Sequence, residues 1–356
     1  MNKKVSLCAL GALILSACAT PATVGPTVSA DVTRVEEQRQ SEFVLAQRAR
    51  EARRIYDVAA KVKRANVEAC PVKAPWLGAA FETVQDYGKD FQSAARTVLG
   101  ASDRPQPVWI AEGGPAARAG LLPTDALVAV NGEPVPRGKK ASEGSAKLIR
   151  KALDAGPVVL TVERASVQAP LHIERELTCG YDVFVDDASD VNAYADGRDL
   201  YVMRGMVKFV ENDEELALVI SHELAHNTMN HVGKQSRNRM VGALAGVLLG
   251  AAAGADQATM QQLGALGGNL TGQAYSQEFE TEADYVGMYY LAQAGYTLDS
   301  VETFWRRMAA EDPKQIRLGF SHPSTASRFV GIQATSREIA EKRQAGGPLS
   351  PNLKPR

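Results

Sequence analysis

The spacing of apolar residues changes character along the chain, and the first stretch, residues 31–70, is predicted to form one long helix. It is rich in charge, and its apolar side chains recur at intervals that place them on one helical face. We expect this face to pack on the rest of the protein. A coiled-coil partner helix is less favoured, because heptads are not sustained. The apolar positions are Val32, Val35, Phe43, Leu45, Ala49, Ile55, Val58 and Val62.

Residues 71–168 are predicted to form a separate β-rich module. Proline and glycine become frequent here, and short apolar runs have the length and alternation of strands. Asn131-Gly132 between two such runs is typical of a hairpin turn. The predicted strands cover 108–110, 125–130 and 158–162, and a helix is expected near 145–154.

Residues 169–335 return to helical spacing and are predicted to form a mainly helical domain with a small sheet. The expected fold class is therefore α+β, with the β-rich module inserted between the N-terminal helix and this domain. The expected strands are 192–195 and 200–203, and the expected helices are 213–232 and 274–294.

Two segments of this last part have special composition. Residues 236–272 are rich in Gly, Ala, Leu and Met, which fits either a packed helical pair or a mobile lid, and both interpretations stay open. Residues 336–356 turn polar and rich in Pro and Gly and are interpreted as a polar tail, of which the last ten residues are expected to be disordered.

Composition limits the classes of function. A chain of 356 residues can hold two domains with real cores. The formal net charge is only −1, which argues against a nucleic-acid partner. Beyond the N-terminus no run of 18 or more apolar residues occurs, which argues against a membrane-spanning helix.

The clearest chemical signal is the sequence His-Glu-Leu-Ala-His at 222–226, inside a predicted helix. A spacing of four places the His222 and His226 imidazoles on one helical face, close enough to bind one metal ion. Glu223 follows the first ligand and suits the role of general base toward a metal-bound water molecule. Glu280 and Asp284, again four apart, lie on the predicted helix 274–294.

In its combination of motifs, the segment from Asn192 to Arg328 resembles the gluzincin metallopeptidases of the HtpX and CAAX-prenyl-protease type, in particular their periplasmic lipoprotein branch. The resemblance implies one zinc ion per chain, with Glu280 as third ligand and Asp284 supporting a ligand from behind. One departure is Ser276-Gln277, where the family often has Ser-Arg. The matching segments are 192–195, 200–202, 222–226 with His231, 275–284, and Ser321-His322-Pro323 with Arg328.

The remaining histidines and Arg328 are assigned less central roles. The resemblance implies that His322 lies near the metal, where it would bind zinc at rest or hydrogen-bond the tetrahedral intermediate. Arg328 is a companion candidate for anion stabilisation. His231 is interpreted as structural, and His172 as a surface residue.

The β-rich module resembles a PDZ domain of the HtrA type. Such domains capture the terminal carboxylate of a peptide with the backbone N–H groups of a short loop. By this resemblance the loop is Trp76-Leu77-Gly78-Ala79. The alternative is a PDZ fold that serves as a spacer or lid and binds no peptide.

The N-terminus resembles a bacterial lipoprotein signal. Lys3 and Lys4 precede an apolar run, and residues 15–18, Leu-Ser-Ala-Cys, resemble a lipobox, so we expect cleavage after residue 17 and lipid on Cys18. An ordinary signal peptide is the alternative. With Ala19 after the cysteine, the resemblance implies the periplasmic face of the outer membrane, with residues 18–30 as a tether.

Cys70 and Cys179 flank the PDZ-like module. Two cysteines in an oxidising compartment favour a disulfide, and two buried free thiols are the alternative.

Together these features predict a zinc endopeptidase that cleaves misfolded or misassembled proteins of the cell envelope. The rival hypothesis is a chaperone or scaffold that binds such proteins through the PDZ-like module while its zinc site stays closed.

Overall fold

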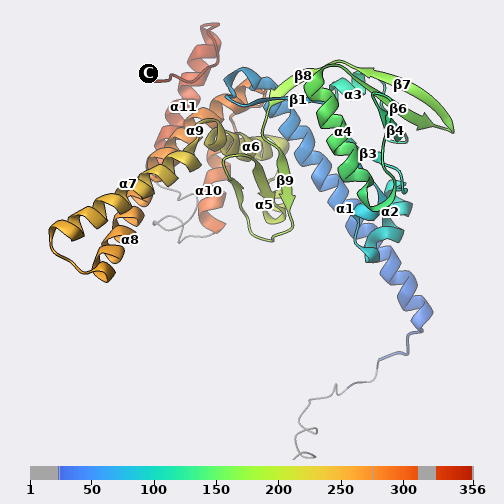
Figure 1. The fold of residues 1–356 in the computed structure, drawn as a ribbon, viewed down its shortest axis with the longest axis horizontal. Coiled ribbons are helices and arrows are strands. Elements are labelled where there is room, and N and C mark those ends of the chain that lie inside the picture. The colour runs from blue at the N-terminus through green and yellow to red at the C-terminus, as the bar shows by residue number, and fades with distance from the viewer. Residues whose placement is uncertain (1–22, 24, 275, 312–325, 355–356) are drawn as a thin grey trace, which may run out of the picture.

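The computed structural model describes residues 23, 25–274, 276–311 and 326–354 (Figure 1). The predicted signal peptide and the lipidation site Cys18 lie outside the described residues, as does His322.

Helix α1 (Ala30–Ala65) is the long N-terminal helix that the sequence predicts. The Ser29 side chain caps it by accepting a hydrogen bond from the Val32 N–H. Only its C-terminal half is buried: Ile55 and Val62 are fully enclosed, whereas Val32 and Phe43 are 62% and 67% exposed. The predicted apolar face is therefore buried only from Leu45 onward. Leu45 packs with Val84, Ala94 and Ala95 of the β-rich module, and the later positions, from Ile55, pack in the core of the helical domain.

The PDZ-like module consists of a four-stranded antiparallel sheet, a separate two-stranded pair and helices on the flanks (Figure 1). Its core includes the fully buried Leu127, Leu160 and Ile173. The sheet has the order β5-β4-β6-β7, formed by Glu133–Pro134, Ala126–Val130, Val158–Arg164 and Val167–Ile173, and the pair is β2 (Ala79–Glu82) with β3 (Gln106–Ile110). The helices are α2 (Gln92–Leu99), α3 (Pro115–Arg118) and α4 (Ala141–Ala155).

The module extends past the boundary at residue 168 that the sequence suggests. Strand β7 pairs with β6 along its whole length, and Ile173 belongs to the module's core. The module is then closed by β1 (Lys73–Trp76), which pairs antiparallel with β8 (Glu176–Cys179). Cys70 and Cys179 form a disulfide at this closing pair, with Cα atoms 5.5 Å apart. Both cysteines are buried in the core of the helical domain, so the bridge lies where the module joins the body.

The helical domain surrounds two long helices that pack side by side, α6 (Asp213–Thr228) and α9 (Ser276–Gln293). A three-stranded sheet lies against α6 in the order β10-β11-β9; β11 is parallel to β9 and antiparallel to β10. The other elements are β9 (Val183–Asp186), β10 (Ala193–Ala195), β11 (Leu200–Met203), α5 (Arg204–Phe209), α10 (Val301–Glu311) and α11 (Ala326–Gln344).

One predicted helix boundary in this domain is wrong. The expected helix 213–232 ends at Thr228, because Asn230 adopts a left-handed conformation (φ 53°) that breaks the helix before α7 begins. The polar tail from residue 336 begins inside α11, which continues as far as Gln344. Ile339 is fully buried there, and Glu338 accepts hydrogen bonds from two tyrosine hydroxyls of α9.

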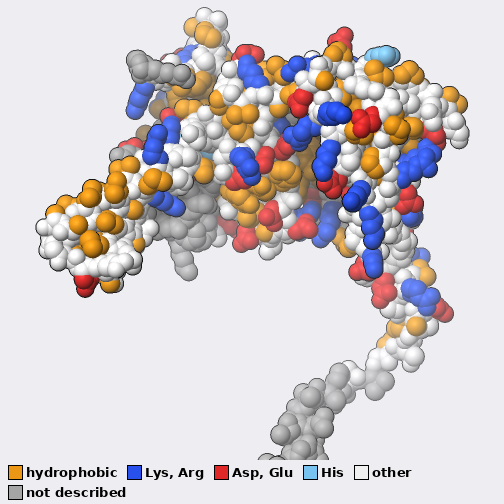
Figure 2. Space-filling view, viewed as in Figure 1, with side chains coloured by type: hydrophobic (Ala, Val, Ile, Leu, Met, Phe, Trp, Pro, Cys, Tyr) orange, Lys and Arg blue, Asp and Glu red, His pale blue; other side chains and the backbone are white. Residues whose placement is uncertain are grey.

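Residues 231–274 form a helical hairpin that extends away from the body (Figure 1). Helices α7 (His231–Ala252) and α8 (Gln257–Ala274) pack closely because Gly242 and Gly246 leave no room for a Cβ atom against the α8 backbone. Apolar side chains such as Leu244 lie on its surface (Figure 2). This is the packed pair of the sequence analysis, and the lid stays a prediction. None of the described helices combines the length and apolar character needed to cross a membrane.

Candidate metal centre

Helix α6 holds the histidine motif in the most protected part of the domain. Its side chains from Glu215 to Asn227 are buried, so the helix is enclosed on all sides. Asn212 caps the helix by accepting a hydrogen bond from the Glu215 N–H. The buried Glu215 carboxylate is balanced by Arg307, at 2.7 Å. A motif on such a helix has little freedom to move.

Three side-chain donors converge from α6 and α9. The Nε2 atoms of His222 and His226 are 3.1 Å apart. The Glu280 carboxylate contributes Oε2 at 3.3 Å from His222 Nε2 and Oε1 at 3.4 Å from His226 Nε2. All three residues are buried, and they form the metal-ligand cluster found among the described residues.

The donor set fits zinc. Two imidazole nitrogens and one carboxylate oxygen are zinc ligands, and bonds of about 2.0 Å in a tetrahedron place the ligand atoms about 3.3 Å apart. The two imidazole nitrogens, 3.1 Å apart, lie near this value, and the two Glu280 oxygens approach them from 3.3 and 3.4 Å. Three protein ligands leave a fourth position for water or substrate, which is the arrangement of catalytic rather than structural zinc.

Gly287 lets the two helices approach closely enough to build this centre. A Cβ atom at Gly287 would lie 3.0 Å from the Cα atom of His222. The absent side chain therefore allows α9 to lie against α6 at the level of the first ligand, two turns after Glu280.

Asp284 supports His222 from behind. Its Oδ1 atom is 3.1 Å from His222 Nδ1, so the imidazole presents Nε2 to the metal. Arg328 binds the same carboxylate in a bidentate manner, at 2.7 and 2.8 Å, and lies over the Trp305 ring. Arg328 also comes within 3.4 Å of Glu280, so in this structure the guanidinium balances the site's carboxylates. Its predicted role in anion stabilisation stays a prediction.

These charges control the protonation of the ligands. Burial lowers the pKa of the His222 imidazole, but its hydrogen bonds to Asp284 and Glu280 outweigh burial and raise the pKa to about 10. Burial raises the pKa of Asp284, but Arg328 outweighs it, and the net pKa is lowered. A raised pKa favours the protonated imidazole in the metal-free centre, and a metal ion bound at His222 would have to displace that proton.

His226 is supported by a second relay, which the sequence analysis did not identify. His231 Nδ1 lies 3.0 Å from His226 Nδ1, and His231 Nε2 lies 2.7 Å from Glu282 Oε2. If Nε2 of His226 binds metal, the proton of this imidazole is on Nδ1, and this N–H donates a hydrogen bond to Nδ1 of His231. The Nε2–H of His231 then donates to Glu282. Each ligand histidine is thus backed by a carboxylate, directly for His222 and through His231 for His226.

Comparison with known proteins identifies the family. Residues 159–336, half of the chain, match the model of peptidase family M48. The chain belongs to peptidase family M48. Residues 108–164 match a PDZ domain. The M48 match contains both relays and all three donors of the metal centre.

Among curated M48-like relatives, the chain is 30% identical over 189 residues to the beta-barrel assembly-enhancing protease of Escherichia coli O157:H7, covering 49% of this chain and 36% of that protein. It is 32% identical over 162 residues to the metalloprotease LoiP of Escherichia coli K12, covering 43% and 61%. It is 28% identical over 151 residues to the mitochondrial metalloendopeptidase OMA1 of Schizosaccharomyces pombe, covering 42% and 44%. The chain therefore spans between about a third and three fifths of these relatives.

Glu223, the expected general base of this M48 site, follows His222 on α6 and is 3% exposed. Its charge adds to those that raise the pKa of Arg328, so the two groups lie within electrostatic reach. His172 is exposed on β7, as predicted, and has no part in the centre.

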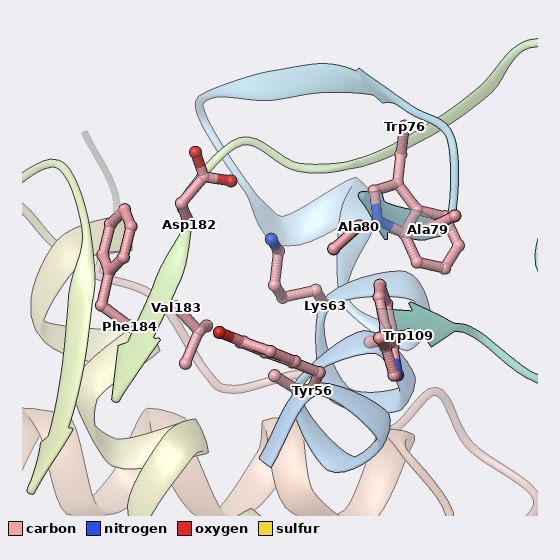
Figure 3. Close-up of a pocket in the computed structure, with 11 residues that line it drawn as sticks. Tyr56, Lys63, Trp76, Ala79, Ala80, Trp109, Asp182, Val183 and Phe184 are labelled. Carbon is pink, nitrogen blue, oxygen red and sulfur yellow. The ribbon is translucent and has the colours of Figure 1, made fainter. Parts of the chain in front are cut away.

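The loop at residues 76–79 precedes β2, as the PDZ resemblance requires. Gly78 has a φ of 76°, and its carbonyl accepts a hydrogen bond from the Ala111 N–H. Leu77 is 4% exposed in the module's core. Trp76 and Ala79, in contrast, line a cavity of about 280 Å³ outside that core (Figure 3). Peptide binding by the loop itself stays a prediction.

Proposed function

We propose that this M48 protein is a zinc-dependent endopeptidase that cleaves misfolded or misassembled proteins of the bacterial cell envelope. The observation that carries the proposal is the convergence of His222, His226 and Glu280, three buried zinc-type donors whose ligand atoms lie within 4.8 Å of one another. Three such protein ligands leave one position open on a tetrahedral zinc ion. Glu223, beside the first ligand, supplies the base that such a site needs.

The residues of the chain divide the chemistry between them. When bound, zinc would supply a Lewis acid that brings the pKa of a water molecule toward neutrality. The Glu223 carboxylate accepts a proton from the water that attacks the scissile carbonyl, and then donates it to the leaving amine nitrogen. Asp284 and His231 hold the ligand imidazoles in position throughout. The enclosed helix limits access of bulk water to these groups.

Glu223→Gln tests the enzyme. This variant should retain about one zinc per chain and cleave an unfolded envelope protein about 10²- to 10⁴-fold more slowly, because the base is lost and the ligands are kept. The measurement is zinc content together with the cleavage rate, with a chelator-treated sample as a second control. Undiminished cleavage by the variant would remove Glu223 from the mechanism. Binding without chelator-sensitive cleavage in the unaltered protein would favour the chaperone hypothesis.

The location is part of the proposal. A lipid on Cys18 would hold the protein at the periplasmic face of the outer membrane through the segment before α1. Cys18→Ser should move the protein from the membrane fraction to the soluble periplasmic fraction while zinc content stays unchanged. Retention in the membrane fraction would contradict the lipid anchor.

A further inference from the structure

The cavity in Figure 3 lies where three parts of the molecule meet. Helix α1 contributes one wall, the β2–β3 pair of the PDZ-like module contributes the second, and the start of β9 in the helical domain contributes the third. Four alanines leave the space open, two on α1 and two on β2, where larger side chains would fill it. They are Ala59, Ala60, Ala79 and Ala80.

Lys63 extends into this cavity from α1 (Figure 3). The residue is only 9% exposed, and its Nζ atom has no hydrogen bond or ion pair with any described residue. Burial lowers the pKa of the Lys63 ammonium, although the more distant Asp182 and Asp199 raise it. The stem of Lys63 is buried, but Nζ is not one of the fully enclosed polar atoms, so an anion that enters the cavity can reach it.

Asp182 does not act as this anion. Its side chain is 62% exposed, and it is paired with Arg150 at 3.9 Å. It lines the cavity but makes no ion pair with Lys63 within 4 Å. The position beside Nζ is therefore left for an anionic group that comes from outside the described chain.

The walls next to Lys63 are apolar, aromatic and held in place. Trp109 lies between Tyr56 and Trp76, with ring centroids 5.7 and 6.2 Å away. Its Nε1–H donates to Asp57 at 2.7 Å, and Arg64 lies over Trp76 at 5.4 Å. Such rings form a preorganised surface for an apolar side chain.

The third wall offers backbone hydrogen bonds. Strand β9 pairs with β11 on one side only, and among the described residues its other edge has no strand partner. The Leu200 N–H donates to the Asp182 carbonyl, so by alternation the N–H and C=O of Val183 point to the free edge. Val183 also lines the cavity, so an extended peptide could add to this edge.

We propose that this cavity binds the C-terminal residue of a protein, with its carboxylate on Lys63 and its apolar side chain against the aromatic wall. The free carboxylate and the apolar side chain of a chain terminus match the two kinds of surface found here. In the framework of the proposed function, the cavity is a docking site for protein substrates, remote from the metal centre. It also lies outside the core of the PDZ-like module, to which neither Trp109 nor Lys63 belongs.

Binding can be measured without catalysis. The full chain carrying Glu223→Gln and Trp305→Phe retains tryptophan only at positions 76 and 109, both in the cavity wall. An eight-residue peptide without tryptophan, ending in Val-Phe with a free carboxylate, should change this fluorescence saturably. The same peptide with an amidated C-terminus should bind about 10- to 100-fold more weakly, as should Lys63→Met toward the free acid. Lys61 is an exposed lysine on the same helix, and the Lys61→Met variant should bind the free-acid peptide with the affinity of the parent.

Each other outcome overturns the proposal. Equal affinity for acid and amide, or for parent and Lys63→Met, would show that no carboxylate is recognised at Lys63. Tighter binding of an amidated peptide that carries an internal glutamate would show that the cavity recognises an acidic side chain and not a chain terminus. If Lys63→Met fails to fold, the comparison is made with a second variant. The cavity-filling Ala80→Leu then decides, because unchanged binding would place the peptide elsewhere. Cleavage of short peptides is measured separately, in chains that retain Glu223. If cavity variants lose peptide binding but still cleave short peptides, the proposed enzyme activity stands whether or not the cavity is a docking site.

Discussion

Glu282 lies behind His231 and not at the metal centre: its Oε2 atom is 2.7 Å from His231 Nε2. Because His231 Nδ1 is in turn 3.0 Å from Nδ1 of His226, the Glu282 charge reaches the second ligand through one imidazole. Lys234, 3.6 Å from Glu282, balances the outer end of this chain. The two ligand histidines are therefore oriented by different devices.

His231→Phe should weaken zinc binding by about 10- to 100-fold. The phenyl ring keeps the stack on Phe279 but cannot accept a hydrogen bond from Nδ1–H of His226. The measurement is zinc affinity by competition with a chromogenic chelator. His172→Phe, at the exposed histidine of β7, should leave zinc affinity unchanged. An affinity equal to that of the unaltered protein would mean that His226 keeps its orientation without the relay.

The metal-free protein should lose stability as pH rises from about 6.5 to about 10. The folded-state pKa of His222 is raised from 6.5 to about 10, so its proton stabilises the fold below the unfolded value and is lost through the folded value. Urea unfolding with a chelator present, followed across this range, measures the effect. His222→Gln should flatten the profile, and a slope that persists in this variant would assign the titration to another group.

Reduction of the Cys70–Cys179 bridge should lower the free energy of unfolding. The bridge joins residues 109 apart in the sequence, and a loop of that length corresponds to about 4 to 5 kcal/mol in chain-entropy estimates. The double variant Cys70→Ser/Cys179→Ser, compared with the unaltered protein in urea, gives the difference. Zinc content should stay at one per chain, since the bridge makes no contact with the ligands. Equal stability with and without the bridge would contradict this estimate.

Gly287→Ala should destabilise the protein by about 1 to 3 kcal/mol and weaken zinc binding, because the new Cβ atom meets the backbone of His222 at 3.0 Å. Gly331→Ala is the matched control: it lies on α11 with no heavy atom within 4 Å of its added Cβ, and should raise stability by about 0.5 to 1 kcal/mol. Thermal unfolding and chelator competition measure both. Similar results for the two variants would show that the α6–α9 contact tolerates a methyl group.

Local spacing allowed the helix of His222 and His226 to be predicted, because two residues four apart on one helix must share a face. Glu280 could be assigned as a ligand only by resemblance, since its approach depends on the packing of α9 on α6. His231 escaped prediction for a geometric reason. Five residues after His226 on a continuous helix, it would point about 140° away, and only the left-handed turn at Asn230 brings it back.

Other features depend on contacts between distant segments. The cavity at Lys63 combines α1, β2–β3 and β9. The local sequence pattern of each of these parts does not predict that it contacts the other two. Strand β9 was not predicted, because Val183–Asp186 is only four residues long and lies between Asp182 and Asp187. The start of α1 is exposed, although its apolar face was expected to pack on the rest of the protein. An apolar face shows where a helix can pack, but it does not show how far the packing partner extends.

The unsupported start of α1 acts as a rigid spacer arm. From Ala30 to Leu45, the first buried residue, the helix rises by about 22 Å at 1.5 Å per residue. If the residues before α1 are held at a surface, this arm adds its own length to the distance that the rest of the protein can reach from that surface. Adding or deleting whole turns within residues 33–42 would change the reach of the peptidase toward its substrates without altering a single contact of the metal centre.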